Sequence, residues 1–419
     1  MNLKNMKYTE QNLISDTSIL LLLNLFASGL NYVYQILIAN VLTVESFGTV
    51  NTIFSVMLVA AVPGTTITML AARHLAIFKE KGAYQMSRVF VRNLTMGVSI
   101  LGVCVFVMGF LFREILGSFL KINDTIILLI TAVICALGYY HPLYSGCMSG
   151  LKKFIPLGIY ALLIPMYKFI GLIGATRLQD EHYRLILCLA VIVPGSIITA
   201  VLGFIYIKKS LVGKDSCDEL AVEMPQKEQW INSFVINICL TLYMNIDILA
   251  VRHIGGTEMS GLYSAVTLFG RIIYYGATSI GTVLLPMVAT KDSKESFDLL
   301  KKVLFVVSGI SIAGLLVLNL AKNLLINLIY GSNYIGAAEY VIYVSVIAFA
   351  IGILTIMVNF FVGIDYVKFP TKLMVVLTVI IIVAVLFIKN VSVTLLTIGV
   401  SGVVSIMILI LQYRKEKNI

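Results

Sequence analysis

Two basic side chains, Lys168 and Arg271, lie within long apolar stretches of the sequence. If those stretches cross a membrane, a cation at a helix centre costs about 2.5 to 3.5 kcal/mol even on a lenient insertion scale. Such a residue usually faces the interior of a helix bundle, pairs with an acid or a carbonyl, or lines a wet pathway. The two positions are therefore the first candidates for a binding site.

Arg271 is suited to binding an anion. It lies ten residues after Gly261, where its helix is expected to begin. At a rise of 1.5 Å per residue this places it about 15 Å deep, close to the middle of a membrane. Its guanidinium offers a rigid fork of donors that suits a phosphate or pyrophosphate. The alternative is a structural ion pair within the bundle.

Lys168 and Asp247 are the other charged candidates. Lys168 lies about 12 Å from the outer end of its helix, where it binds an anion or is satisfied by carbonyls or an acid. Asp247 is the clearest intramembrane acid, about 6 Å from the outer end of its own helix. It could pair with Arg271 or Lys168, carry a proton or Na⁺ during coupling, or cap the helix rim near Arg252.

Neutral polar and aromatic side chains in the apolar stretches could recognise a sugar. These residues are Asn31, Gln35, Tyr140, His141, Tyr167 and Tyr274. Hydrogen bonding between helices is the more common role for the two amides. Aromatic faces stack on sugars, but tyrosines also pack within bundles. His141, next to Pro142, is more often a satisfied donor than a proton relay.

The composition predicts an all-α polytopic membrane protein. Of 419 residues, 59% are apolar and only 12% are charged, and the mean hydropathy is +0.97. A soluble domain carries about 25% charged residues. Twelve apolar segments are long enough to cross a hydrocarbon core of about 30 Å. The segments are 17–42, 48–72, 93–112, 125–148, 155–176, 185–207, 231–251, 261–289, 301–321, 338–360, 371–389 and 393–412.

The basic residues set the expected orientation. If the N-terminus is cytoplasmic, 22 of the 31 lysines and arginines fall in inner segments, 7 in outer loops and 2 in the membrane. The positive-inside rule then predicts that both termini are cytoplasmic. The net charge of +10 lies in short loops rather than in an aromatic-interleaved patch, which argues against a nucleic-acid partner. The six cysteines have no paired spacing, so we expect no disulfide and no metal site.

The longest polar stretch, 208–230, divides the chain into two halves of six helices. We expect an N-terminal lobe at 1–207, a cytoplasmic linker at 208–230 and a C-terminal lobe at 231–419. An offset of 213 residues places Glu45-Ser46-Phe47-Gly48 on Glu258-Met259-Ser260-Gly261. An even number of helices per half makes the repeat parallel, and two such lobes facing each other enclose a cleft.

Sequence motifs of enzymes are missing from the chain. There is no Walker sequence, no HExxH, no GxSxG and no pair of catalytic carboxylates in an aqueous setting. We therefore expect no enzymatic activity and no bound cofactor. Transport would draw on a Na⁺ or H⁺ gradient or on the gradient of the substrate itself.

Three stretches resemble the oligosaccharide flippase branch of the multidrug/oligosaccharidyl-lipid/polysaccharide exporter superfamily. They are ILIANVLTVESFGTVNTIFSVM (36–57), GLYSAVTLFGRIIYYGATSIGTVLLPMVA (261–289) and INLIYGSNYIGAAEYV (326–341). The resemblance implies a V-shaped bundle of two six-helix lobes around a cationic central cavity. It also implies alternating access by rocking of the lobes.

The function implied by the resemblance is the flipping of undecaprenyl-pyrophosphate-linked oligosaccharide repeat units across the bacterial cytoplasmic membrane. These units build surface polysaccharide such as capsule or O-antigen. Arg271 and Lys168 fit contacts to pyrophosphate or acidic sugar. Expected partners are the lipid-linked oligosaccharide, membrane lipids, glycosyltransferases and a polysaccharide polymerase.

Two other functions remain open. A drug extruder of the same fold, driven by H⁺ or Na⁺, would ask for more acids in the N-terminal lobe than the sequence holds. A scaffold for a polymerase complex would leave the two buried cations without a role. The lipid II flippase branch has more cavity arginines near its N-terminus, whereas the first two helices here contain no Arg or Lys.

Overall fold

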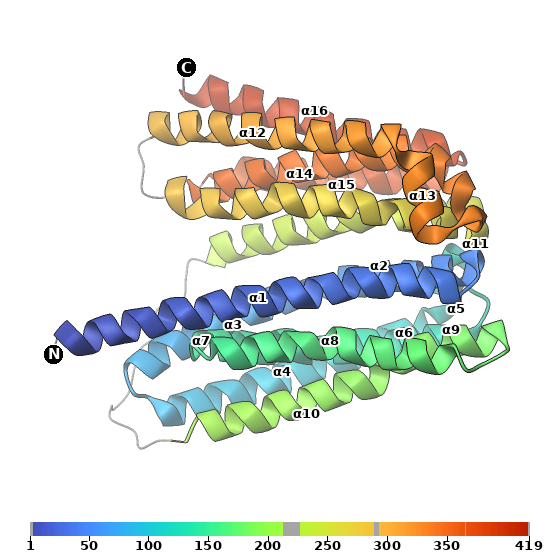
Figure 1. Cartoon of the computed structure of the whole chain (residues 1–419). Helices are drawn as coiled ribbons and strands as arrows, with labels where there is room; N and C mark the ends of the chain where they lie inside the picture. The colour runs from blue at the N-terminus through green and yellow to red at the C-terminus, as the bar shows by residue number, and fades with distance from the viewer. Residues whose placement is uncertain (1–2, 213–226, 289–292, 365, 418–419) are drawn as a thin grey trace. The chain divides into compact units, whose positions relative to one another are not determined.

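The structure is a computed structural model that describes residues 3–212, 227–288, 293–364 and 366–417 (Figure 1). Within these ranges every regular element is a helix. The first part of the chain contains α1 (Leu3–Val41), α2 (Val44–Ala60), α3 (Val62–Glu80), α4 (Tyr84–Leu111), α5 (Arg113–Leu120), α6 (Thr125–Leu137), α7 (Tyr140–Gly150), α8 (Phe154–Ala175), α9 (Glu181–Ala190) and α10 (Ile192–Ser210). The rest contains α11 (Lys227–Val288), α12 (Ser293–Leu320), α13 (Lys322–Tyr330), the 3₁₀ helix η1 (Ser332–Tyr340), α14 (Val341–Gly363), α15 (Lys368–Phe387) and α16 (Val391–Lys417).

The helices form two compact units. The first comprises Met1–Leu42 and Ala60–Val222, and the second comprises Thr43–Val59 and Glu223–Ile419. Helix α2 therefore groups with the second unit. The expected division into 1–207, 208–230 and 231–419 and the V-shaped cavity stay predictions, and residues 213–226 of the expected linker lie outside the described residues.

The length and apolar character of the helices confirm the predicted all-α membrane fold. Ten helices of the described ranges are long and apolar enough to cross a membrane, or eleven if the bent pair α2 and α3 forms one span. The exact number of crossings, twelve from the sequence, stays a prediction.

Proline explains where several apolar segments break. The expected helix 48–72 is instead α2 and α3, which are bent by 44° where Pro63 enters the first turn of α3. Pro142 and Pro194 likewise lie in the first turns of α7 and α10. A proline is tolerated there because its missing N–H would have no partner in the helix.

Element α11 folds back on itself at Gly256, whose φ of 87° is outside the helical region. Tyr263 and Asp247 would lie about 24 Å apart along a straight helix, yet their side chains are hydrogen-bonded at 2.8 Å. The two arms of this hairpin lie antiparallel in Figure 1. They correspond to the expected segments 231–251 and 261–289, of which residue 289 lies outside the described residues.

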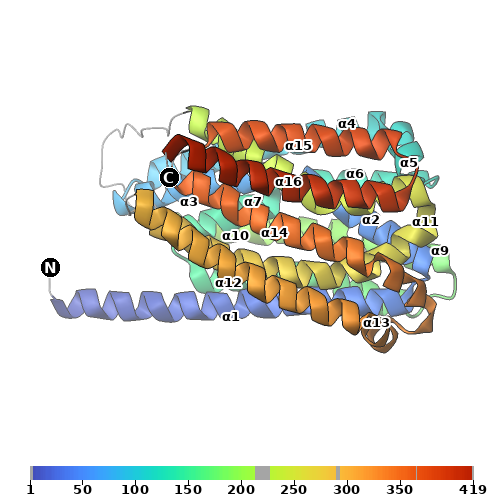
Figure 2. The ribbon, with the colours of Figure 1, turned by 90° about the horizontal axis from the view of Figure 1, so that it is seen from above.

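Helix α14 lies at the core of the second unit. It packs against α11, α12 and α16, and Figure 2 shows α12, α14 and α16 running alongside one another. Most of its length is buried, and its sequence is apolar on all faces, as expected for a central helix. The α11 hairpin is therefore packed against a buried central helix.

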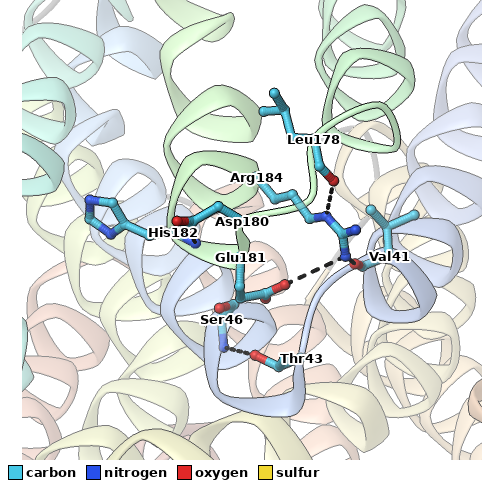
Figure 3. A network of polar contacts seen from close by, with 8 residues as sticks. All are labelled: Val41, Thr43, Ser46, Leu178, Asp180, Glu181, His182 and Arg184. Carbon is cyan, nitrogen blue, oxygen red and sulfur yellow. Dashed lines mark hydrogen bonds and ion pairs between the residues drawn. The ribbon is translucent and has the colours of Figure 1, made fainter.

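Arg184 ties the start of α9 to the end of α1 within the first unit (Figure 3). Its Nε donates to the Leu178 carbonyl at 2.7 Å and its Nη1 to the Val41 carbonyl at 3.4 Å. The Glu181 carboxylate lies 3.8 Å from the same nitrogen. The α1 carbonyl bound here is one that the helix itself leaves without a partner.

Replacing Arg184 with alanine is expected to lower the free energy of unfolding by about 1 kcal/mol, because it removes two partly exposed hydrogen bonds. The thermal unfolding midpoint of the purified protein would measure this loss. Arg177→Ala is the matched control, since Arg177 is an exposed arginine of the loop that precedes α9. Equal midpoints for the two variants would contradict the role given to Arg184.

Candidate functional site

Lys168 is held within the first unit by helix α1. Helices α1 and α8 pack along each other, and Gly158 of α8 allows the close approach, because a Cβ there would meet Leu23. The Lys168 Nζ donates to Asn31 Oδ1 at 3.2 Å and lies 5.5 Å from the centroid of the Tyr34 ring. A neutral amide and an aromatic face stabilise an ammonium without neutralising its charge.

The two amides of α1 share one face of that helix, four residues apart. Asn31 Nδ2 donates to the Ala27 carbonyl at 3.0 Å, which fixes the amide so that its oxygen faces Lys168. Gln35 Oε1 is buried and has no hydrogen-bond partner among the described residues. The structure thus joins Asn31 directly to Lys168 and places Gln35 one turn further along.

Tyr140, His141 and Tyr167 have other contacts within the first unit. The Tyr140 hydroxyl lies 2.8 Å from that of Ser99 on α4. The His141 ring stacks on Tyr160 with centroids 4.8 Å apart and an interplanar angle of 7°, and its Nε2 is buried without a hydrogen-bond partner in the described ranges. The Tyr167 ring packs against Gly195 of α10, where an added Cβ would collide with it. Their assignment to sugar binding stays a prediction.

Arg271 is held in the second unit by a neutral partner across the α11 hairpin. Its Nη2 donates to Asn245 Oδ1 at 3.1 Å. Asn245 is buried, and its own Nδ2 donates to the Thr241 carbonyl at 2.9 Å, which fixes the orientation of the amide. Arg271 itself is half-buried, and no carboxylate of the described residues forms an ion pair with it. A guanidinium has five N–H donors, and the bond to Asn245 uses one of them.

Asp247 lies in the same hairpin but bonds elsewhere. Its Oδ2 accepts from the Tyr263 hydroxyl at 2.8 Å, and its Oδ1 accepts from the Ile248 backbone N–H at 2.8 Å. Arg271 is close enough to act on Asp247 electrostatically without forming a direct pair. The expected pairing of the two charges is thus replaced by a bond to Tyr263. Ion coupling by Asp247 stays a prediction.

Tyr274 lies one turn beyond Arg271 and is half-buried. Its ring meets that of Tyr275 edge-on, with centroids 5.2 Å apart, and its hydroxyl interacts with the Thr355 side chain of α14. It belongs to the same arm of the hairpin as Arg271. Sugar contact by Tyr274 stays a prediction.

Two contributors to these clusters carry no signal in the linear sequence. Tyr34 and Tyr263 are apolar-segment tyrosines like many others, and only the fold places them beside Lys168 and Asp247. Arg252 is one of the seven basic residues predicted for outer loops, and for this residue the prediction is wrong. Its side chain is buried within α11, in electrostatic reach of Glu45, because the hairpin tip packs against α2.

A comparison with models of protein families matches residues 13–291 to the model described as "Polysaccharide biosynthesis protein". That match covers more than half of the chain. The chain belongs to the polysaccharide biosynthesis protein family. This result confirms the resemblance to this branch of the exporter superfamily that the sequence motifs predicted. A comparison with curated proteins found no match.

Solved structures of superfamily members share the fold of this family member. The lipid II flippase MurJ in an inward closed conformation is 16% identical, with a TM-score of 0.70 over 94% of this chain and 87% of its own. An inward-facing multidrug resistance MATE family transporter is 12% identical, with a TM-score of 0.70 over 95% and 97% of the two chains. A third structure is a superfamily transporter from Pyrococcus furiosus whose binding pocket is described as having reverse polarity. It is 14% identical, with a TM-score of 0.61 over 96% of this chain and 95% of its own.

The family and the fold agree on the broad class of this polysaccharide biosynthesis protein. It is a multi-pass membrane protein with the fold of flippases and transporters. The two charged clusters described above lie in helices of that membrane fold. A cation inside a membrane is costly, so the presence of Lys168 and Arg271 in these helices indicates a specific role.

Proposed function

We propose that the protein flips undecaprenyl-pyrophosphate-linked oligosaccharide repeat units across the bacterial cytoplasmic membrane for the assembly of surface polysaccharide. One observation carries the proposal. Arg271 is fixed by the neutral oxygen of Asn245 in a helix long and apolar enough to span a membrane, while no carboxylate of the described residues forms an ion pair with it. The cost of burying such a charge is offset when an anionic cargo passes beside it.

The chemistry of pyrophosphate suits this arrangement. A guanidinium binds phosphate oxygens through two parallel hydrogen bonds, and its charge persists at any physiological pH. Lys168 in the first unit offers a second cation, held by an amide and a ring. No covalent step is needed, because the cargo is moved by alternating access while its lipid tail stays in the bilayer.

The cellular setting follows from the same proposal. Both termini lie in the cytoplasm, as the distribution of basic residues predicts. Glycosyltransferases that build the repeat unit act before this protein, and a polymerase of capsule or O-antigen acts after it. The polysaccharide biosynthesis family and the fold of the lipid II flippase MurJ support this placement.

The second candidate is a drug extruder driven by H⁺ or Na⁺. The buried carboxylate of Asp247 is the observation in its favour, because coupled extruders need an intramembrane acid. The MATE transporters of the same fold support it as well. A cationic drug would, however, be repelled by Arg271 and Lys168.

Deletion of the gene separates these two functions. For the flippase, we expect loss of surface polysaccharide and accumulation of lipid-linked repeat units on the cytoplasmic face, both reversed by a plasmid copy. Extraction of the lipid-linked units and a surface stain would measure the two effects. Normal polysaccharide together with increased sensitivity to cationic dyes would overturn the proposal in favour of drug extrusion.

A further inference from the structure

We infer that Tyr263 is a positioning residue that keeps the Asp247 carboxylate off Arg271, so that the guanidinium stays open to an anionic cargo. The inference rests on the proposed function, since it takes Arg271 as the residue that binds the anion. It adds an internal competitor to that site. Asp247 would fill the place of the cargo if Tyr263 did not hold it.

Asp247, the internal competitor, and Arg271, the proposed anion site, lie in the same hairpin. Asn245 and Asp247 lie on the first arm of α11, and Tyr263 and Arg271 lie on the second. Arg271 donates a hydrogen bond to Asn245, two positions before Asp247, and it acts on Asp247 electrostatically. When a guanidinium and a carboxylate come into contact, they frequently form a bidentate pair.

Tyr263 supplies the reason that they do not. Its hydroxyl donates to Asp247 Oδ2 at 2.8 Å, and the Ile248 backbone N–H occupies the other carboxylate oxygen. The neighbouring Tyr243 does not share this role, because its hydroxyl donates to the Ile398 carbonyl at 3.0 Å. Among the described residues, Tyr263 is the one side chain that donates a hydrogen bond to this carboxylate.

The Tyr263 side chain is fixed, so the hydroxyl is presented in one direction. Its accessible surface is 0%, and its ring meets that of Tyr340 edge-on, with centroids 5.9 Å apart and an interplanar angle of 79°. A phenylalanine fits the same space and keeps the ring contact. Tyr263→Phe therefore removes the hydrogen bond and leaves the packing.

The loss of that bond would redirect Asp247. A buried carboxylate that loses one of its donors gains by taking another, and Arg271 is the cation that already acts on it electrostatically. The Arg271 charge would then be neutralised from within the hairpin. An incoming anion would have to displace Asp247 before it could bind.

Binding of farnesyl pyrophosphate to the purified full-length protein in nanodiscs tests the inference. Farnesol, which has the same tail without the charge, corrects for partition into lipid. We expect Tyr263→Phe to weaken binding about tenfold, which is the effect of about 1.4 kcal/mol of internal competition. Adding Asp247→Asn to that variant removes the competitor and should restore the affinity to within about twofold of the wild type.

Two further variants separate the possible outcomes. Tyr340→Phe removes a hydroxyl from the same ring cluster and should bind like the wild type. Arg271→Ala should bind no better than the protein binds farnesol. If Arg271→Ala binds like the wild type, the proposed anion site itself is wrong. If Arg271→Ala loses binding while Tyr263→Phe keeps it, or if Asp247→Asn fails to restore it, only the role of Tyr263 is wrong.

Discussion

Arg271→Ala is expected to abolish export of surface polysaccharide while the amount of protein in the membrane stays near that of the wild type. The variant loses the guanidinium that the anion would bind, and one charge-assisted contact of this kind is worth about 1.5 to 3 kcal/mol. Export should therefore fall by more than about tenfold. Quantification of surface polysaccharide and an immunoblot of membranes would measure the two quantities.

The expected effect on folding is small, and this separates a binding role from a structural one. The variant breaks one hydrogen bond to Asn245, worth about 1 kcal/mol. Breaking a buried ion pair would cost about 3 to 5 kcal/mol, but no such pair to Arg271 exists in the described ranges.

A matched control and two contrary outcomes make the prediction about Arg271 decisive. Arg113→Ala removes an arginine that lies over the Phe110 ring at the end of α4, and it should leave export unchanged. Normal export by Arg271→Ala would show that the anion site is wrong. A fall in protein abundance that accounts for the lost export would show that Arg271 is structural.

The helices were predictable from the sequence because a membrane imposes a length of apolar residues on each of them. The breaks that divide some of the expected segments into two helices were harder to predict from the sequence. Proline at position 63 permits a continued helix or a bend, and the bend of 44° depends on how α2 and α3 pack. The sequence predicted the apolar stretches but neither the breaks within them nor the direction of the chain after each break.

Candidate residues of the site were predictable individually, whereas their partners were not. Lys168 and Arg271 stand out because charge is rare in apolar stretches. Lys168 bonds to a residue 137 positions away, and Arg271 bonds to one 26 positions away. Such pairs depend on the register of packed helices, which hydropathy does not encode. Arg252 was assigned to a loop for the same reason, since hydropathy cannot distinguish a buried hairpin tip from an exposed one.

The second largest effect is expected at a pair of glycines where α2 meets the second arm of α11. A Cβ added at Gly48 would lie 2.8 Å from the Thr257 carbonyl oxygen, and one added at Gly261 would collide with the Val44 carbonyl oxygen. The sequence offset of 213 residues carries Val44 onto Thr257 and Gly48 onto Gly261. The contact is thus reciprocal, as a two-fold relation between the two segments would make it.

Replacing either glycine with alanine should destabilise the protein by about 1 to 3 kcal/mol, because the obstructing atoms are backbone atoms that cannot turn aside. Thermal unfolding midpoints and the yield of folded protein would measure the loss. Gly309→Ala is the control in the same unit, since no atom lies within 4 Å of its added Cβ. That substitution in a helix should be neutral or stabilising by up to about 1 kcal/mol.

The reciprocity of the contact predicts how the two substitutions combine. The first added methyl group already separates the two backbones, so the second meets less resistance. The double variant Gly48→Ala/Gly261→Ala should therefore be less destabilised than the sum of the single variants, by about 1 kcal/mol or more. Full additivity would mean that each glycine is needed for a separate reason, and the two segments would then not form a reciprocal contact.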